Sequence, residues 1–251
     1  MKVVILCGGK GTRYNADKPK SLAMIGDKPI IHHLMDIYSA QGHNDFILTL
    51  GWRQEDIVNY FTKKIEHTFN ITYVDTGQNS NTAKRLKLIQ NYATKDWDEK
   101  GDLYTNENFF CTYADGLSNI NLTKLYMRHI THKNVSTLTA IQPVNQFGEL
   151  KFDSVGNVIE FKEKPRMKEY INGGFFIFNK KIFDYIDINK NQELEKDILA
   201  KLAENNQLGS YKHDDKDSFW ITLNTAKDEI MINELYRKRE LYNEIMDWLR
   251  I

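Results

Sequence analysis

The chain begins with a short apolar run that leads directly into a glycine-rich loop. The run VVILC covers residues 3–7, and the loop GGKGTR follows at 8–13 without a spacer. A strand that is apolar at consecutive positions is typical of a parallel sheet whose two faces are both covered. This first element therefore favours an α/β fold in which a loop leaves the carboxyl end of a central strand.

The remainder of the first half alternates between strand and helix patterns. Strands are predicted at 44–51, 71–77 and 108–116, and helices at 25–42, 55–61 and 83–93. Asp27 is expected to cap the first helix and Gly42 to end it. The alternation predicts a Rossmann-like, doubly wound, mainly parallel mixed sheet. The motifs CGGKGTR, VDTG (74–77) and YADG (113–116) then lie at carboxyl ends of strands, where such sheets bind ligands.

The pattern changes after residue 143. Residues 147–165 predict a β-hairpin whose turn contains Gly156 and Asn157, and INGGFFIF at 171–178 predicts a further strand that starts with a glycine pair. Apolar residues at helical spacing predict helices at 194–208 and 226–249. Since no linker or internal repeat interrupts the chain, we expect one domain over 1–251, with a ligand-binding core at 1–143 and an elaboration with a C-terminal helix at 144–251.

The overall charge excludes several classes of partner. Lys plus Arg and Asp plus Glu both number 34 among 251 residues, so the formal net charge is zero. A neutral chain has no electrostatic basis for general binding to nucleic acid or a membrane surface.

Cys7 and Cys111 lie in apolar runs and are expected to be buried free thiols. Because no apolar stretch is long enough for a signal peptide or a membrane span, a soluble cytoplasmic protein is expected.

Four basic side chains surround the glycine loop: Lys10, Arg13, Lys18 and Lys20. Like charges gathered in one place are unfavourable unless an anion joins them. The loop lacks the GxxxxGK[ST] pattern of a P-loop, and Tyr14 stands where a GxGxxG dinucleotide motif needs glycine, which disfavours a hydride-transferring enzyme. Against a plain basic surface turn, the sequence favours a loop that cradles a polyphosphate with its own cations.

GGKGTR followed by KPKSL (18–22) resembles the signature of the sugar-phosphate nucleotidyltransferases. The resemblance extends to VDTG, TAKRLK (82–87), YADG, FGEL, EKP (163–165) and INGGFF, and it is greatest to the glucose-1-phosphate cytidylyltransferases. It implies a Mg²⁺-dependent cytidylyltransferase that moves CMP from CTP to a phosphorylated small-molecule acceptor and releases pyrophosphate. It also implies that the enzyme forms a homo-oligomer and that residues 144–251 bind the acceptor. Catalysis would rest on positioning and charge neutralisation, since the attacking phosphate is already anionic.

The resemblance also implies roles for individual residues. Arg13 would hold the departing pyrophosphate, Lys20 the α-phosphate and Lys164 the acceptor phosphate, while Asp115 would bind Mg²⁺. The implied nucleotide contacts are Leu6, Gly8, Gly9, Gly11, Thr12, Thr82 and Arg85. The implied acceptor contacts are Glu163, Lys164, Asn172 and Gly173.

The chain departs from the family pattern at three places. In FWITLNT (219–225), Asn224 stands where the family has a second metal-binding Asp, so an uncharged amide oxygen would be the second ligand, or Asp214, Asp215 or Asp217 would take its place. TAKR replaces the TGGR stretch that contacts base and ribose, and the segment between Arg13 and Lys18 is short.

These departures leave the acceptor open. Glucose 1-phosphate is one candidate, and L-glutamine phosphate, as in a CTP:phosphoglutamine cytidylyltransferase of capsule synthesis, is another. The alternative to an enzyme is a regulatory domain that binds a nucleotide or sugar phosphate without turnover. Trp52, Trp97, Trp220 and Trp248 are expected to serve packing or interfaces.

Overall fold

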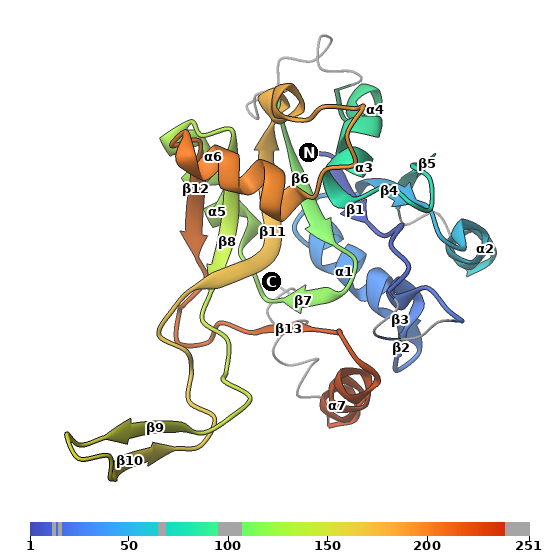
Figure 1. Cartoon of the computed structure of the whole chain (residues 1–251). Coiled ribbons are helices and arrows are strands. Elements are labelled where there is room, and N and C mark those ends of the chain that lie inside the picture. The colour runs from blue at the N-terminus through green and yellow to red at the C-terminus, as the bar shows by residue number, and fades with distance from the viewer. Residues whose placement is uncertain (12–13, 15–16, 65–68, 95–106, 239–251) are drawn as a thin grey trace.

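The protein is built around one twisted sheet of seven strands, shown in the computed structural model of Figure 1. The model describes residues 1–11, 14, 17–64, 69–94 and 107–238. The strand order is β12-β8-β11-β6-β1-β4-β5. The bounds of these strands, in chain order, are β1 Val3–Leu6, β4 Asp45–Leu50, β5 Asn70–Asp75, β6 Asn108–Tyr113, β8 Ser136–Ile141, β11 Ile171–Asn179 and β12 Leu208–Lys212.

The pairing of these strands confirms a mainly parallel mixed sheet. β1 pairs in parallel with both β4 and β6, β4 with β5, and β8 with β12, whereas β11 runs antiparallel between β6 and β8. Because β11 is reversed, its first residues lie at the same edge of the sheet as the carboxyl ends of β1, β4, β5 and β6. That edge also carries the glycine loop and the YADG turn.

Both faces of the sheet are covered, as the first apolar run predicts. Val3 and Ile5 pack into one core cluster and Val4 and Leu6 into another, because successive side chains of a strand point to opposite faces. The first cluster includes residues of α1 (Ile30–Ser39), α2 (Gln54–Lys64), α5 (Leu122–His132) and α7 (Ala226–Arg237). The second includes residues of α3 (Thr82–Leu88), α4 (Gln90–Thr94), the 3₁₀ helix η2 (Lys180–Tyr185), the π-helical turn η3 (Leu194–Leu199) and α6 (Ala200–Glu204).

Short elements complete the edge that carries the loop. They are the 3₁₀ helix η1 (Lys20–Leu22), the two-stranded pair β2 (Met24–Ile25) with β3 (Lys28–Pro29), and β7 (Gly116–Ser118) paired with β13 (Trp220–Thr222). The β7–β13 pairing brings the segment before α7 next to the turn that follows β6. Among the described residues, every helix is too short or too polar to traverse a lipid bilayer.

The predicted hairpin is present and stands apart from the sheet. β9 (Glu149–Phe152) and β10 (Val158–Lys162) form an antiparallel two-stranded ribbon, and Gly156 adopts a positive φ of 95° in its turn. In Figure 1 the ribbon projects away from the body on two extended connections. A bulge interrupts the pairing of β11 with β8 between Asn172 and Phe176, where the sequence has its glycine pair.

Three local expectations need correction. Asp27 does not cap α1, whose N-cap is Pro29, because Lys28 and Pro29 pair with β2 and Asp27 instead accepts a hydrogen bond from Tyr236. Gly42 has the expected positive φ of 85°, but α1 ends earlier, at Ser39. The predicted helix at 83–93 is divided at Ile89 into α3 and α4. The last helix is described from Ala226 to Arg237, and the rest of its predicted span lies outside the described residues.

Candidate active site

A cavity of about 530 Å³ opens at the carboxyl edge of the sheet. Its walls come from segments that are distant in the sequence: the loop after β1, helix η1, the turn after β6, the start of β11, strand β13 and the residue that precedes α7. The predicted site residues that line it are Leu6, Gly9, Gly11, Lys20, Thr82, Asp115, Asn172, Gly173 and Asn224. This is the place that the sheet topology indicates for a ligand.

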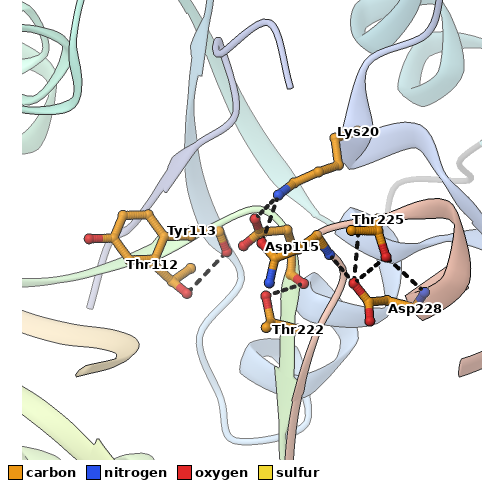
Figure 2. A network of polar contacts seen from close by, with 8 residues as sticks. Lys20, Thr112, Tyr113, Asp115, Thr222, Thr225 and Asp228 are labelled. Carbon is orange, nitrogen blue, oxygen red and sulfur yellow. Dashed lines mark hydrogen bonds and ion pairs between the residues drawn. The ribbon is translucent and has the colours of Figure 1, made fainter. Parts of the chain in front are cut away.

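Lys20 is the charged centre of this cavity (Figure 2). Its ammonium forms an ion pair with the carboxylate of Asp115 and donates a hydrogen bond to Oδ1 of Asn224 at 3.5 Å. The Lys20 and Asp115 side chains are 19% and 22% exposed, so solvent screens the pair only in part. The structure therefore brings together a cation, a carboxylate and an amide oxygen from three separate segments, of which the first and last, at Lys20 and Asn224, are 204 residues apart in the sequence.

Backbone contacts hold Asp115 and Asn224 next to each other. The amide of Leu223 donates to the carbonyl of Asp115 at 2.9 Å. On the other side, the Asn224 amide donates to Oδ2 of Asp228 at 2.9 Å. Asp228 also forms a capping box with Thr225 at the start of α7, which satisfies amides that a helix terminus leaves free. The cap of α7 thus holds Asn224 in place. Figure 2 shows the contacts between Thr225 and Asp228 that form this cap.

The donor set at this point suits a hard divalent cation. Asp115 and Asn224 both present oxygen atoms to the Lys20 ammonium, so they lie within reach of one position. Mg²⁺ binds through one or two protein oxygens and takes its remaining ligands from water and substrate phosphates. Within the described part of the chain, His, Cys, Asp and Glu form no cluster of three that could hold a metal without such help.

Arg85 lies beneath the glycine loop and is only 3% exposed. Its guanidinium donates to the carbonyl of Gly8 at 2.8 Å, to the carbonyl of Leu50 at 3.1 Å and to the hydroxyl of Thr76 at 2.7 Å. These three acceptors follow or end β1, β4 and β5. Burial lowers the pKa of Arg85, and the negative charge of Asp75 opposes that shift. Arg85 therefore ties three strand ends together, and it is not among the residues that line the cavity.

The same guanidinium explains one glycine of the loop. A Cβ added at Gly8 would lie 2.1 Å from Nη1 of Arg85, and one at Gly51 would lie 2.6 Å from it. Such distances are far below any van der Waals contact, so both positions require glycine while Arg85 keeps its place. Gly11 is different: it has a positive φ of 56°, which a residue with a side chain adopts only with strain.

The cavity lining also contains a carboxylate that sequence patterns did not indicate. Glu195, in η3, accepts a hydrogen bond from the hydroxyl of Tyr113 and lies 3.4 Å from the hydroxyl of Thr82. Thr82 in turn accepts a hydrogen bond from the amide of Leu194 at 2.8 Å. Burial, followed by the charge of Glu195, raises the pKa of Tyr113 above its ordinary value. Glu195 stands in an ordinary amphipathic helix pattern, which holds no signal for a site.

The start of β11 forms the remaining wall. Oδ1 of Asn172 accepts a hydrogen bond from the amide of Gly174 at 2.9 Å, and the indole of Trp220 donates to the carbonyl of Gly173 at 2.8 Å. Gly174 has a positive φ of 79°. Trp220 thus lines the cavity and orients the glycine pair, a role that the expectation of simple packing did not include.

Several predicted site residues are not brought to this cavity. Glu163 and Lys164 are exposed at the base of the ribbon, outside the cavity lining, and Lys164 has a positive φ of 46°. Thr12 and Arg13 lie outside the described residues. The three loop aspartates are exposed and outside the lining; Asp214 accepts a hydrogen bond from Tyr170, and Asp215 lies 3.4 Å from Lys124.

Comparison with known proteins agrees with this geometry. The family described as nucleotidyl transferase matches residues 2–239. The chain belongs to this family, and it is a nucleotidyltransferase enzyme. The match confirms the resemblance carried by the GGKGTR and KPKSL motifs.

Members of the family align with nearly the whole nucleotidyltransferase. A Bacillus subtilis (strain 168) protein named probable glucose-1-phosphate cytidylyltransferase is 38% identical over 95% of this chain and 97% of its own length. A Salmonella typhi glucose-1-phosphate cytidylyltransferase is 35% identical over 95% and 96%. The crystal structure of HddC from Yersinia pseudotuberculosis complexed with GMP-PN superposes with a TM-score of 0.69 at 22% identity, over 94% of this chain and 99% of that one. This last likeness shows the shared fold.

Proposed function

We propose that this nucleotidyltransferase moves CMP from CTP to the phosphate of a small-molecule acceptor and releases pyrophosphate. The observation that carries the proposal is the convergence of Lys20, Asp115 and Asn224 beside the glycine loop. The choice of CTP follows the names of the two relatives at 38% and 35% identity, which align from end to end with this chain.

The chemistry is a substitution at phosphorus. An oxygen of the acceptor phosphate forms a bond to the α-phosphorus of CTP, the bond from that phosphorus to the bridging oxygen breaks, and pyrophosphate leaves with the electron pair. No side-chain nucleophile is needed. Lys20 neutralises charge that accumulates on the α-phosphate, and the loop amides after β1 receive the phosphate chain. Arg13 and Lys164 remain the predicted partners of pyrophosphate and of the acceptor phosphate.

Mg²⁺ is the proposed cofactor, with Asp115 and Asn224 as its protein ligands. When bound, the ion would neutralise phosphate charge and hold the triphosphate in a reactive geometry. The chain's own part is to hold one carboxylate and one amide oxygen at the same point, which the β7–β13 pairing and the cap of α7 achieve.

The proposed acceptor is a sugar 1-phosphate, with glucose 1-phosphate first because both relatives carry that substrate in their names. The cavity offers groups suited to a polyol: the carboxylate of Glu195 and the amide of Asn172 can accept or donate hydrogen bonds to hydroxyl groups. A role in the synthesis of cell-surface polysaccharide precursors follows if this acceptor is correct.

A second acceptor, L-glutamine phosphate, is favoured by two observations. Because Asn224 is an amide, the metal position has one negative charge fewer than a pair of carboxylates would give it, and Glu195 adds a carboxylate to the cavity lining. A carboxylate facing an otherwise phosphate-binding cavity must meet a neutral or cationic part of the ligand, and the α-ammonium group of an amino acid is cationic.

A matrix assay separates these possibilities. The four nucleoside triphosphates are combined with glucose 1-phosphate or L-glutamine phosphate in the presence of Mg²⁺, and pyrophosphate release is measured. We expect turnover with CTP and one acceptor, and loss of turnover in Lys20→Ala. Glu195→Gln keeps the shape and removes the charge, so it should impair an ammonium-bearing acceptor more than a sugar phosphate. Tight binding of CTP without pyrophosphate release from any pair would instead indicate a regulatory domain.

A further inference from the structure

Two asparagine-containing loops that are distant in the sequence are joined beside the cavity. Asn191 precedes η3, and its side-chain Oδ1 accepts a hydrogen bond from the amide of Asn81, 110 residues away, at 2.6 Å. Its Nδ2 donates to the carbonyl of Asn79 at 3.0 Å, and its own carbonyl accepts from Nδ2 of Asn81 at 3.0 Å. The side chain of Asn191 therefore connects the loop before η3 to the loop before α3 through both of its polar atoms.

The first residues of the two helices make a further connection. The hydroxyl of Thr82, at the start of α3, accepts a hydrogen bond from the amide of Leu194 at 2.8 Å and lies 3.4 Å from Oε2 of Glu195. The first amides of a helix have no acceptor within the helix and need one from elsewhere. Among the described residues, the N-cap Glu193 gives η3 no side-chain cap of its own. Thr82 supplies that cap from a distant segment.

The start of α3 receives its cap from the other segment in return. In a capping box, the side chain at the third helical residue accepts the amide of the N-cap residue. The N-cap of α3 is Asn81, and the third residue is Lys84, whose ammonium cannot accept a hydrogen bond. Asn191 takes this place. In the part of the chain that the structure describes, the Asn81 side chain makes no cap bond to α3 and instead donates to Asn191. Each helix thus caps the other, and these contacts form a pair of reciprocal caps.

The reciprocal caps connect a fixed element to a wall of the cavity. Arg85 ties α3 to three strand ends, so α3 is the fixed side. The buried side chain of Leu194 holds η3 against the core, and the caps determine where the first turn of η3 lies. That turn carries Glu195, which lines the cavity together with Thr82, whereas Asn191 is outside the lining. Its π-helical geometry is rare and is found frequently at functional sites.

We propose that Asn191 is a positioning residue for nucleotidyl transfer. Through the reciprocal caps it holds the carboxylate of Glu195 in a constant place relative to Thr82, so that the acceptor meets the bound nucleotide in a reactive geometry. This proposal rests on the proposed function, in which Glu195 contacts the acceptor. Asn191 acts through Glu195 and contacts neither substrate.

Steady-state kinetics and calorimetry test the proposal together. Asn191→Ala should lower kcat/KM for the acceptor by ~10-fold, because the acceptor is misaligned. The Kd of CTP, measured by calorimetry with Mg²⁺ and without acceptor, should stay unchanged. Asn191→Asp keeps the oxygen that accepts the Asn81 amide and loses the donor to Asn79, so its loss should be smaller. The matched control is Asn189→Ala in the same exposed loop, where the backbone amide makes the contact with Asp187; it should behave as wild type.

Hydrogen exchange measures the reciprocal caps without any reaction. Amides in 79–82 and 193–196 should exchange faster in Asn191→Ala than in the wild-type protein, and Asn189→Ala should match the wild type. Unchanged exchange in Asn191→Ala would overturn the proposal, as would an unchanged kcat/KM for the acceptor. An equal loss of CTP affinity would also overturn it, since the effect would then not be specific to the acceptor. Absence of pyrophosphate release by the wild-type protein with every substrate pair would refute the proposed function instead, and the exchange measurement would then decide whether the caps exist.

Discussion

The central sheet and the ribbon use the same kinds of side chain in opposite surroundings. In β11, Phe175, Phe176 and Phe178 are at most 1% exposed, whereas Phe152 and Phe161 of the ribbon are more than half exposed. The sheet has helices on both faces, and the ribbon has none on either (Figure 1). The comparison shows that an apolar side chain in a strand is buried only where a neighbouring helix or strand layer covers it. The composition of the strand alone does not determine its burial.

The largest expected effect is on the stability of the central sheet. Phe176→Ala removes a fully buried ring and should lower the free energy of unfolding by about 3–5 kcal/mol. Phe161→Ala should change it by less than about 0.5 kcal/mol when the protein is dilute enough to be monomeric. Urea unfolding followed by fluorescence measures both. Equal losses would show that the ribbon is packed within its own chain.

The second prediction concerns the role of Lys20 in catalysis. Lys20→Ala should lower kcat by ~10²-fold or more, since the ammonium is lost from a partly desolvated phosphate site. Lys20→Arg is the matched variant that keeps the charge and should retain part of the activity. Val155→Ser, at the exposed turn of the ribbon, should leave kcat unchanged. Near-normal turnover in Lys20→Ala would remove the role assigned to this residue.

Arg85→Lys tests how the strand ends are held. One ammonium cannot reach the three acceptors that the guanidinium bridges, so kcat/KM for CTP should fall by ~10-fold and the Tm should fall with it. Lys63→Ala, at an exposed position of α2, is the control. If nucleotide affinity falls while the Tm stays unchanged, Arg85 contacts the nucleotide directly, as the family resemblance implies.

Asn224→Asp adds a carboxylate next to Asp115. The Mg²⁺ concentration for half-maximal activity should decrease by roughly fivefold, because a charged oxygen binds a hard cation more strongly than an amide does. Asn224→Ala should raise that concentration. An unchanged Mg²⁺ dependence in both variants would separate Asn224 from metal binding.

The last prediction concerns the pH dependence of the protein's stability, which we expect to depend on a buried histidine. His129 is buried between Thr137 and Asn108, and burial lowers its pKa from 6.5 to about 4. The unfolded chain therefore binds more protons than the folded one between these values, so stability should fall as the pH falls from 6.5 to 4. His129→Gln should flatten the decline, and His132→Gln, at an exposed position, should not. Unfolding midpoints across this range give the measurement.

Much of the site was predictable because its signals are local. A glycine loop after a buried strand, the Asp–Gly turn after another, and the glycine pair at the start of β11 depend on backbone preferences that neighbouring residues determine. Lys20, Asp115 and Asn224 were predicted by resemblance and meet in the structure. The ribbon itself followed from alternation and a Gly–Asn turn.

What escaped prediction depends on contacts between distant segments. Glu195 reaches the cavity because η3 packs beside α3, and Trp220 does so because β13 pairs with β7. Arg85 turns under the loop because three strand ends present acceptors there. Asp27 accepts a hydrogen bond from Tyr236, 209 residues away in the sequence, in place of its expected role as a helix cap.

By itself, the sequence determined the alternation of strands and helices in the first half of the chain, the mainly parallel character of the sheet and the edge at which the cavity opens. It did not predict α5, β8, β12 or β13. Hydrophobic periodicity and the residue preferences of turns involve only neighbouring residues, so they can be read directly from the amino-acid sequence. Only the tertiary structure decided which side chains meet in the cavity and which apolar faces stay uncovered. Those outcomes depend on the packing of elements that lie far apart in the sequence, which no local pattern records.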